Sequence, residues 1–176
     1  MQKDLKNDPR YQNHESRPDL AGEHPVGDTW QGIGMLVFIA AAVLDYFLLG
    51  NPQRFNQQIS FWARLPFSLA LFGLGVWLAL RGIQVVFGEY REEPVMITED
   101  LFAYMRHPVY LGSILLYLAV LLLVLSPLAG LVWLGILGLY HWLAKYEEGR
   151  MLGIFGERYR AYQQHVPMWL PIKFNK

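Results

Sequence analysis

The sequence predicts an all-α integral membrane protein with four transmembrane helices. Of its 176 residues, 53% are hydrophobic and only 17% are charged, which is more apolar than an ordinary soluble domain. Long apolar stretches cover residues 32–49, 65–87 and 109–143. A helix needs roughly 20 apolar residues to cross the hydrocarbon core, and only helices or closed barrels satisfy their backbone groups there. The third stretch is long enough for two crossings, so we expect four helices.

The first part of the chain is a polar arm followed by two of these helices. Residues 1–29 are polar, contain three prolines and show no helical periodicity, so we interpret them as a cytoplasmic N-terminal arm. The membrane domain then extends over residues 30–176. Its first two helices are expected at about 32–49 and 65–87, joined by a short external loop.

The third and fourth helices form a predicted hairpin, at about 109–125 and 128–148, with its turn at Ser126-Pro127. Pro108 suits the first turn of a helix and disfavours helical conformation in the residue before it, so the third helix should begin there. The fourth helix is expected to continue into the cytoplasm until glycines interrupt it. A short amphipathic segment with Tyr159 and Tyr162 follows, giving a C-terminal helical segment on the cytoplasmic side.

The distribution of basic residues predicts the orientation in the membrane. Lysine and arginine gather in the N-terminal arm, in the connection between the second and third helices, and in the C-terminal tail. The external connections hold only Arg54 and Arg64. Because cytoplasmic loops are enriched in basic residues, both termini should be cytoplasmic. The inner connection, residues 88–106, is predicted to contain a short interfacial helix at 101–104.

Two charged residues lie within the predicted helices. Asp45 falls near the outer end of the first helix, and Arg81 near the inner end of the second. At these different depths they should not pair with each other. We expect Arg81 to extend toward the cytoplasmic interface and Asp45 to be hydrated at the outer surface.

A first candidate site is the segment Arg106-His107-Pro108-Val109-Tyr110 at the start of the third helix. A helix start presents free N–H groups and positive dipole character, which favour a carboxylate ligand. Arg106, His107 and Tyr110 add hydrogen-bond donors at the same point. Alternatively, these side chains are interfacial anchors and part of an aromatic belt.

A second candidate is the adjacent pair Glu147-Glu148 at the inner end of the fourth helix. One carboxylate could neutralise an amino group or accept hydrogen bonds from a ribose. The alternative is a solvated helix end in which Glu147 pairs with Arg150. The chain has no cysteine, so it offers neither a thiolate nucleophile nor a sulfur-ligated metal site, and we expect no metal.

Four segments together resemble the isoprenylcysteine carboxyl methyltransferase and phospholipid methyltransferase superfamily, over roughly residues 85 to 174. They are Arg106-His107-Pro108-x-Tyr110-x-Gly112, Glu147-Glu148, Phe155-Gly156-x-x-Tyr159-x-x-Tyr162 and Val166-Pro167-x-x-Leu170-Pro171. The resemblance implies a membrane methyltransferase that uses S-adenosyl-L-methionine from a cytoplasmic pocket. It also implies a lipid-like acceptor that enters from the bilayer between the helices.

The resemblance also assigns roles to individual positions. It implies that the cofactor is bound by residues of the inner connection, the third helix start and the acidic pair: Val95, Met96, Ile97, Phe102, Arg106, His107, Pro108, Tyr110 and Glu147. Glu147 would be the cofactor carboxylate. If the acceptor must lose a proton, His107, Tyr104 and Glu148 are candidate bases, and the sequence does not rank them.

One position departs from the family pattern. Prenylcysteine methyltransferases carry an arginine one turn before the first glutamate, where this chain has Leu143. That difference argues against a carboxylate-bearing prenylcysteine acceptor. Two other functions remain open: an NADPH-dependent membrane reductase of the sterol reductase type, and a non-catalytic membrane protein that keeps the fold. No nucleic-acid partner is expected, and the sequence leaves the oligomeric state open.

Overall fold

The structure is a computed structural model that describes residues 22, 24–89, 91 and 93–170. Within that part of the chain all regular elements are helical, so the all-α prediction is confirmed. In chain order they are α1 (Gly27–Leu44), the π-helix η4 (Asp45–Leu49), α2 (Asn51–Gln58), α3 (Phe61–Phe87), the 3₁₀-helix η5 (Asp100–Ala103), α4 (Pro108–Val124), α5 (Pro127–Phe155) and α6 (Glu157–His165). Most of the predicted N-terminal arm lies outside the described residues.

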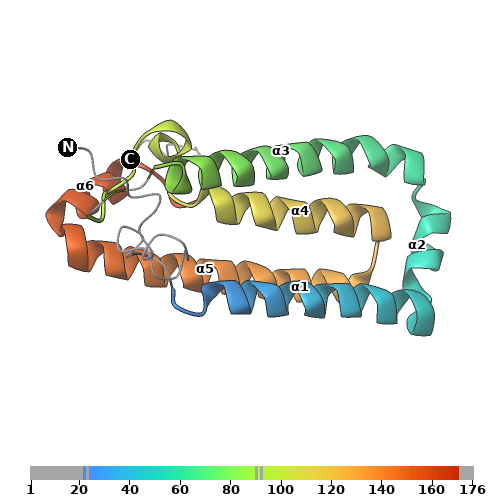
Figure 1. The fold of residues 1–176 in the computed structure, drawn as a ribbon. Helices are drawn as coiled ribbons and strands as arrows, with labels where there is room; N and C mark the ends of the chain where they lie inside the picture. Colours follow the sequence, from blue (N-terminus) through green and yellow to red (C-terminus); the bar gives the residue numbers. More distant parts are fainter. Residues whose placement is uncertain (1–21, 23, 90, 92, 171–176) are drawn as a thin grey trace.

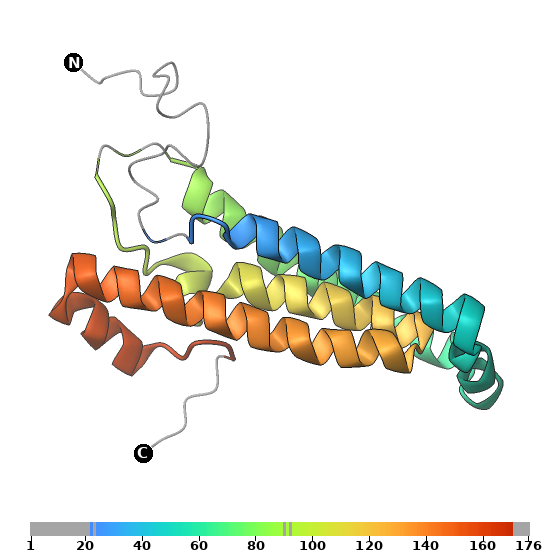
Figure 2. The same cartoon turned by 90° about the horizontal axis from the view of Figure 1, so that it is seen from below.

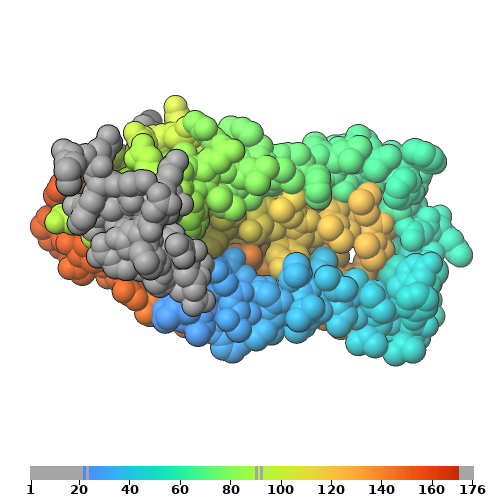
Figure 3. Space-filling view, viewed as in Figure 1, coloured from blue at the N-terminus to red at the C-terminus, as the bar shows by residue number. Residues whose placement is uncertain are grey.

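The long helices α1, α3, α4 and α5 run side by side in an elongated bundle (Figure 1). Helix α2 crosses one end of the bundle, and α6 folds back against α5 at the other end (Figures 1 and 2). The main helix pairs are α3 with α4 and α1 with α5. In the space-filling view α4 is visible along the hollow between α1 and α3 (Figure 3).

Three helical stretches are long and apolar enough to cross a membrane: Gly27–Leu49, Phe61–Phe87 and Pro127–Phe155. Helix α4 is apolar but has only 17 residues, or roughly 25 Å at 1.5 Å per residue. Large hydrophobic side chains such as Phe47, Trp62 and Phe67 stand exposed on the outer faces of the bundle. The chain is therefore built as a membrane protein, with three membrane-capable helices and a shorter fourth beside them.

The first two helices differ from their predicted extents. Helix α1 begins at Gly27, before the predicted residue 32, and α3 begins at Phe61, before the predicted residue 65. The connection between the first two long helices, predicted as an external loop, contains α2 with Pro52 in its first turn. A proline at that position fits a helix start, because the missing N–H would have had no helical partner.

The hairpin of α4 and α5 agrees closely with the sequence prediction. Helix α4 begins at Pro108, and α5 begins at Pro127, after Ser126 whose side chain accepts a 3.1 Å hydrogen bond from the Ala129 N–H. Helix α5 continues to Phe155 and ends at Gly156, whose φ of +56° favours glycine. The predicted C-terminal helical segment is α6, and the predicted interfacial helix is η5.

Helices α3 and α4 approach each other at glycines that leave no room for a side chain. A Cβ placed on Gly112 would lie 2.7 Å from the Gly75 carbonyl oxygen, and one on Gly75 would lie 2.9 Å from the Gly112 carbonyl oxygen. Nearer the start of α4, a Cβ on Gly82 would lie 2.6 Å from Val109 Cγ2. This backbone contact fixes α4, and with it the residues at its N-terminal end, against α3.

The prediction that Asp45 is hydrated is wrong. Asp45 is fully buried. Its carboxylate accepts hydrogen bonds from Ser126 Oγ at 2.5 Å and from the Leu128 N–H at 3.0 Å, at the start of α5. Asn51 Nδ2 donates to its other oxygen at 2.7 Å. The carboxylate thus caps a helix that follows it by some eighty residues, where a negative charge is favoured.

Arg64 provides the complementary contact at the end of α4. It is 6% exposed, and its Nη1 donates to the carbonyl oxygens of Leu122 at 2.9 Å and Leu123 at 2.8 Å. A cation is favourable at a helix C-terminus for the same electrostatic reason. Asp45 and Arg64, here called the turn clamp, therefore hold both helix ends that meet at the hairpin turn.

Candidate functional site

The candidate residues of the third and fourth helices meet at the end of the bundle opposite α2. The site cluster consists of Arg106 and His107, which precede α4, Tyr110 in its first turn, and Glu147 and Glu148 on α5. Pro108 is fully buried beside them. Because α4 and α5 are antiparallel, the start of one lies next to the late turns of the other. The interpretation of Glu147-Glu148 as a solvated helix end is therefore wrong.

Arg106 and Glu148 form a buried ion pair. Arg106 Nε donates to Glu148 Oε1 at 2.6 Å, and the two side chains are 9% and 3% exposed. Arg106 Nη1 also donates to the carbonyl oxygens of Gln163 at 3.1 Å and Val166 at 2.5 Å. Gln163 Nε2 donates to Glu148 Oε2 at 3.0 Å. These contacts occupy the Arg106 guanidinium with protein groups, so its main structural effect is to join α5 to the C-terminal segment.

Glu147 faces the other side of the cluster and is more accessible. The Tyr110 hydroxyl donates to Glu147 Oε1, and His107 Nδ1 lies 3.6 Å from Glu147 Oε2. The Tyr110 and His107 rings are stacked, with centroids 5.7 Å apart and planes 5° from parallel. The Glu147 side chain keeps 18% of its surface exposed. A carboxylate that is held in place yet partly open can receive a cation or hydroxyl group of a ligand.

The second ring nitrogen of His107 is an unpaired buried polar atom. His107 is 9% exposed, and its Nε2 has no hydrogen-bond partner in the part of the chain that the structure describes. Its closest acidic neighbour is Glu148 Oε1 at 3.4 Å. Since buried polar groups are nearly always paired in folded proteins, this atom is a place where a ligand could complete the bonding.

The C-terminal segment after α6 packs against the cluster, through contacts that the sequence did not predict. The Arg106 N–H donates to the Pro167 carbonyl at 3.0 Å, and the His107 N–H to the Met168 carbonyl at 3.3 Å. These contacts place the Trp169 ring 5.9 Å from His107. The Val166-Pro167 motif signalled that the segment mattered, but no sequence feature indicated the partners of Trp169.

Beside the cluster, toward the middle of the bundle, lies an apolar and aromatic core. Buried Phe38, Ile136 and Tyr140 belong to it, and Tyr110 and Trp169 pack against it. The Tyr110 and Tyr140 rings are 5.1 Å apart. Tyr110 therefore belongs both to the polar cluster and to the apolar core, which places polar ligand groups next to a region suited to an aliphatic chain.

The remaining predicted site residues lie in the connection between α3 and α4. Tyr104 is 65% exposed, so the structure sets this candidate base apart from the cluster. Val95 is 49% exposed, whereas Met96 and Ile97 are half-buried in the same extended stretch. The Phe102 carbonyl accepts a 2.6 Å hydrogen bond from the Tyr162 hydroxyl of α6. The predicted roles of these residues in cofactor binding stay predictions.

Leu143, at the position of the family arginine, is fully buried on α5. It lies one turn before Glu147 and next to the start of α1, where a Cβ on Gly27 would be 3.8 Å from its Cδ2. The position thus contributes an apolar surface to the site end of the bundle and supplies no charge.

Burial shifts the pKa values of His107 and Tyr162, two groups outside the membrane-spanning helices. Burial lowers the pKa of His107, and the neighbouring Glu148 opposes that shift only in part. The histidine is therefore neutral around pH 7. Burial also raises the pKa of Tyr162 to about 12, so its hydroxyl stays protonated and able to donate to Phe102.

We expect the free energy of unfolding to fall as the pH is lowered through about 6.5. The folded-state pKa of His107 is lower than its unfolded value, so the unfolded chain binds the proton first on acidification. The stability that His107 contributes is fully present above its unfolded pKa and is lost as the pH falls below that value. The free energy of unfolding then changes by at most about 1.4 kcal/mol per pH unit. Denaturant unfolding from pH 7.5 to 5.5 measures it. His107→Gln should flatten the profile, while the exposed His165→Gln should not; equal profiles for all three proteins would contradict the expectation.

The known proteins to which this chain is similar include methyltransferases. The chain is 24% identical over 153 residues to the protein-S-isoprenylcysteine O-methyltransferase of Dictyostelium discoideum, covering 71% of this chain and 64% of that protein. It is 27% identical over 154 residues to the methanethiol S-methyltransferase of Crocosphaera subtropica, covering 84% of this chain and 53% of that protein. The chain thus spans between half and two thirds of the length of these relatives.

A family model described as phospholipid methyltransferase matches residues 63–158. The match extends from α3 to the start of α6, includes every member of the site cluster, and covers more than half of the chain. The chain therefore belongs to the phospholipid methyltransferase family, as its sequence motifs predicted.

Proposed function

We propose that this protein transfers a methyl group from S-adenosyl-L-methionine to a lipid-like acceptor embedded in the membrane. The observation that carries the proposal is the site cluster, in which the partly exposed Glu147 and the unpaired His107 Nε2 lie beside an apolar core. Family membership favours methyl transfer over the reductase and non-catalytic alternatives.

The residues present suit this cofactor. Glu147 offers an acceptor to the amino group or the ribose hydroxyls, and a hydrogen bond from the Tyr110 hydroxyl fixes the orientation of that carboxylate. Arg106 and Glu148 would act indirectly, by joining the C-terminal segment to α5. Val95, Met96, Ile97 and Phe102 would complete the cofactor site from the preceding connection.

The bound cofactor would supply a methyl group that its sulfonium already activates. The protein then has to align the acceptor, exclude water and, for an acceptor that carries a proton, provide a base. Trp169 and Tyr110 would exclude water, since both pack between the cluster and the apolar core. Of the candidate bases, neutral His107 is the best placed, because Glu148 is paired with Arg106 and Tyr104 is exposed.

We further propose that α4 crosses the membrane as the fourth span and that the site end of the bundle is cytoplasmic. The basic residues of the inner connection and of the C-terminal part support this orientation, since both lie at the site end. The soluble cofactor would then enter from the cytoplasm, while the acceptor would reach the site from the bilayer.

Titration of S-adenosylhomocysteine into the detergent-purified protein tests the cofactor site. We expect binding that Glu147→Gln weakens by about tenfold or more, because a hydrogen bond to a charged group contributes about 1.5–3 kcal/mol. His107→Ala should weaken it too. Calorimetry gives the dissociation constants, and circular dichroism verifies folding.

The matched control is Glu157→Gln, whose carboxylate is 81% exposed on α6 and should leave binding unchanged. Folded protein that binds no S-adenosylhomocysteine would overturn the proposal, and NADPH would then be titrated for the reductase alternative. Binding that is insensitive to Glu147→Gln would remove Glu147 from the cofactor site.

We also propose that the acceptor carries no carboxylate at its reacting end. The cluster contains two carboxylates, and its one guanidinium is already paired with one of them. Leu143 adds no charge, and neutral His107 gives none. A carboxylate at the reacting end of the acceptor would lie near Glu147, and the cluster has no unpaired cation left to bind it.

Assays with labelled methyl donor should therefore show faster methylation of an aliphatic thiol than of a prenylated cysteine with a free carboxylate. We expect the ratio of kcat/KM values to be at least about tenfold, the equivalent of one unfavourable interaction of about 1.4 kcal/mol. Preferential methylation of the carboxylate would contradict this assignment without affecting the cofactor proposal.

A further inference from the structure

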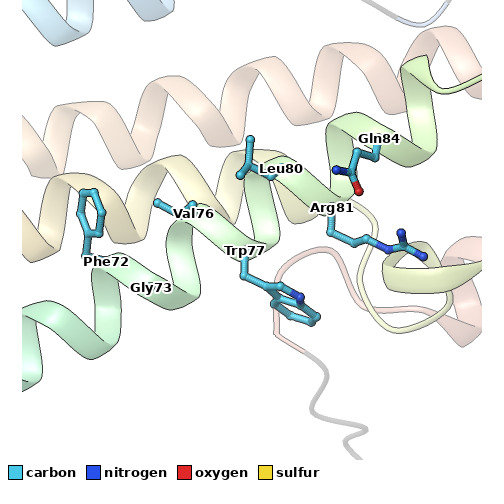
Figure 4. Close-up of a pocket in the computed structure, with 7 residues that line it drawn as sticks. All are labelled: Phe72, Gly73, Val76, Trp77, Leu80, Arg81 and Gln84. Atoms are coloured by element: carbon cyan, nitrogen blue, oxygen red, sulfur yellow. The ribbon is translucent and has the colours of Figure 1, made fainter.

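An ion pair outside the site cluster connects α3 to the segment that leads into the cluster. Arg81 Nε and Nη2 donate to Asp100 Oδ2 at 3.0 Å and 2.5 Å. Figure 4 shows the Arg81 side chain extending away from α3, next to Trp77, Leu80 and Gln84. The sequence led us to expect Arg81 to extend to the interface, but it did not reveal this partner.

Asp100 has an unusual backbone conformation, which the ion pair helps to maintain. Its φ of +55° lies in the left-handed region, which residues with a Cβ seldom adopt. Its Oδ1 accepts a 2.8 Å hydrogen bond from the Leu101 N–H. Oδ2 accepts from Arg81, so both oxygens are used in holding this turn. The hydrogen bond from Arg81 also lowers the pKa of the carboxyl.

The segment from Asp100 to Met105 leads directly into the site cluster. Leu101 and Met105 are 7% exposed and pack against Leu78, which is one turn before Arg81 on α3. Arg106 and His107 follow Met105 without an intervening residue. The position of this short segment on α3 therefore determines where the Arg106 and His107 side chains meet α5.

We propose that Arg81 and Asp100 are positioning residues for the cofactor site, because their ion pair fixes the residue 100–105 segment on α3 and thereby places Arg106 and His107. The inference rests on the proposed function, since it concerns the same site. Among the described residues, the Arg81 and Asp100 side chains form hydrogen bonds with each other and with Leu101, so we expect their effect on binding to be indirect.

The test compares Arg81→Gln, Asp100→Asn and the double variant. Asparagine also tolerates positive φ, so Asp100→Asn removes the charge and leaves the backbone preference in place. We expect each single variant to weaken S-adenosylhomocysteine binding about two- to fivefold, the range for exposed ion pairs. The double variant should bind S-adenosylhomocysteine no more weakly than the single variants do. Arg81→Lys, which keeps the positive charge, should lose less affinity than Arg81→Gln.

Hydrogen exchange of the Leu101–Met105 amides gives a readout that needs no ligand. Exchange should rise in this segment in all three variants and stay unchanged in the middle of α5, which separates local release from general destabilisation. Arg160→Gln is the matched control, because its ion pair with Glu157 is also exposed but lies on α6. It should alter neither readout.

The inference would be overturned if the unaltered protein bound S-adenosylhomocysteine and the single variants bound it with the same affinity. It would also be overturned if the loss of affinity in the double variant equalled the sum of the two single losses. Unchanged exchange at Leu101–Met105 would do the same. If the unaltered protein bound no S-adenosylhomocysteine, the proposed function would fail and the positioning role with it. The exchange measurement would still show whether the ion pair holds the segment, so the two failures are distinguishable.

Discussion

Arg106→Ala is expected to reduce the free energy of unfolding by about 3–5 kcal/mol, because it removes one partner of a buried ion pair. Glu148 would be left 3% exposed without its guanidinium. The carbonyl oxygens of Gln163 and Val166 would also lose their Arg106 donor. Denaturant unfolding in detergent measures the loss, and limited proteolysis should show the C-terminal segment released first.

Two further variants test whether the loss comes from the uncompensated charge. Arg160→Ala removes an arginine whose side chain is 60% exposed and should change stability by less than about 0.5 kcal/mol. Combining Arg106→Met with Glu148→Leu should recover most of the stability, because an apolar pair of similar volume leaves no buried charge. A loss from Arg106→Ala no larger than that from Arg160→Ala would show that the pair is not structural.

Gly112→Ala is expected to destabilise the protein by about 1–3 kcal/mol through overpacking, and to weaken cofactor binding as well. The added Cβ would lie 2.7 Å from the Gly75 carbonyl oxygen and 2.8 Å from the Ala79 amide nitrogen. Both are backbone atoms, so only separation of α3 from α4 relieves the contact. Since α4 begins beside His107, that displacement should also move the site cluster, as titration with S-adenosylhomocysteine would show.

The matched control is Gly138→Ala on α5, where an added Cβ meets nothing within 4 Å. There alanine should stabilise the helix by about 0.5–1 kcal/mol, because glycine loses more conformational freedom on folding. The two substitutions are chemically identical but should have opposite signs. Destabilisation of the same size in both proteins would contradict the argument from the close helix contact.

The sequence was sufficient for the features that local patterns determine. Apolar run length predicted the long helices, and Pro108 and Pro127 marked the starts of α4 and α5. Because the hairpin is antiparallel, the sequence order also predicted that the His107 and Glu147 regions lie at the same end. The prediction failed at α2, because the connection was expected to be a loop although its Pro52 also suits a helix start.

The contacts that the sequence could not supply join residues far apart in the chain. Asp45 is buried because Ser126 and Leu128 reach it, and no pattern near residue 45 indicates those partners. The motif predicts that Arg106 binds a ligand, but it does not indicate that Gln163 and Val166 of the C-terminal part accept hydrogen bonds from its guanidinium. Such polar partnerships depend on the tertiary arrangement, which apolar periodicity does not specify.

The turn clamp also links the order of synthesis to the order of assembly. Asp45 and Arg64 precede α4 and α5, so both leave the ribosome before the helix ends that they hold. Until the hairpin arrives, the carboxylate and the guanidinium require water at the membrane surface, because an unpaired charge is costly in hydrocarbon. Docking of α4 and α5 would then replace that water with groups of the hairpin, among them the Leu122 carbonyl, the Leu128 N–H and the Ser126 hydroxyl. The turn clamp can therefore form only after α4 and α5 have been made.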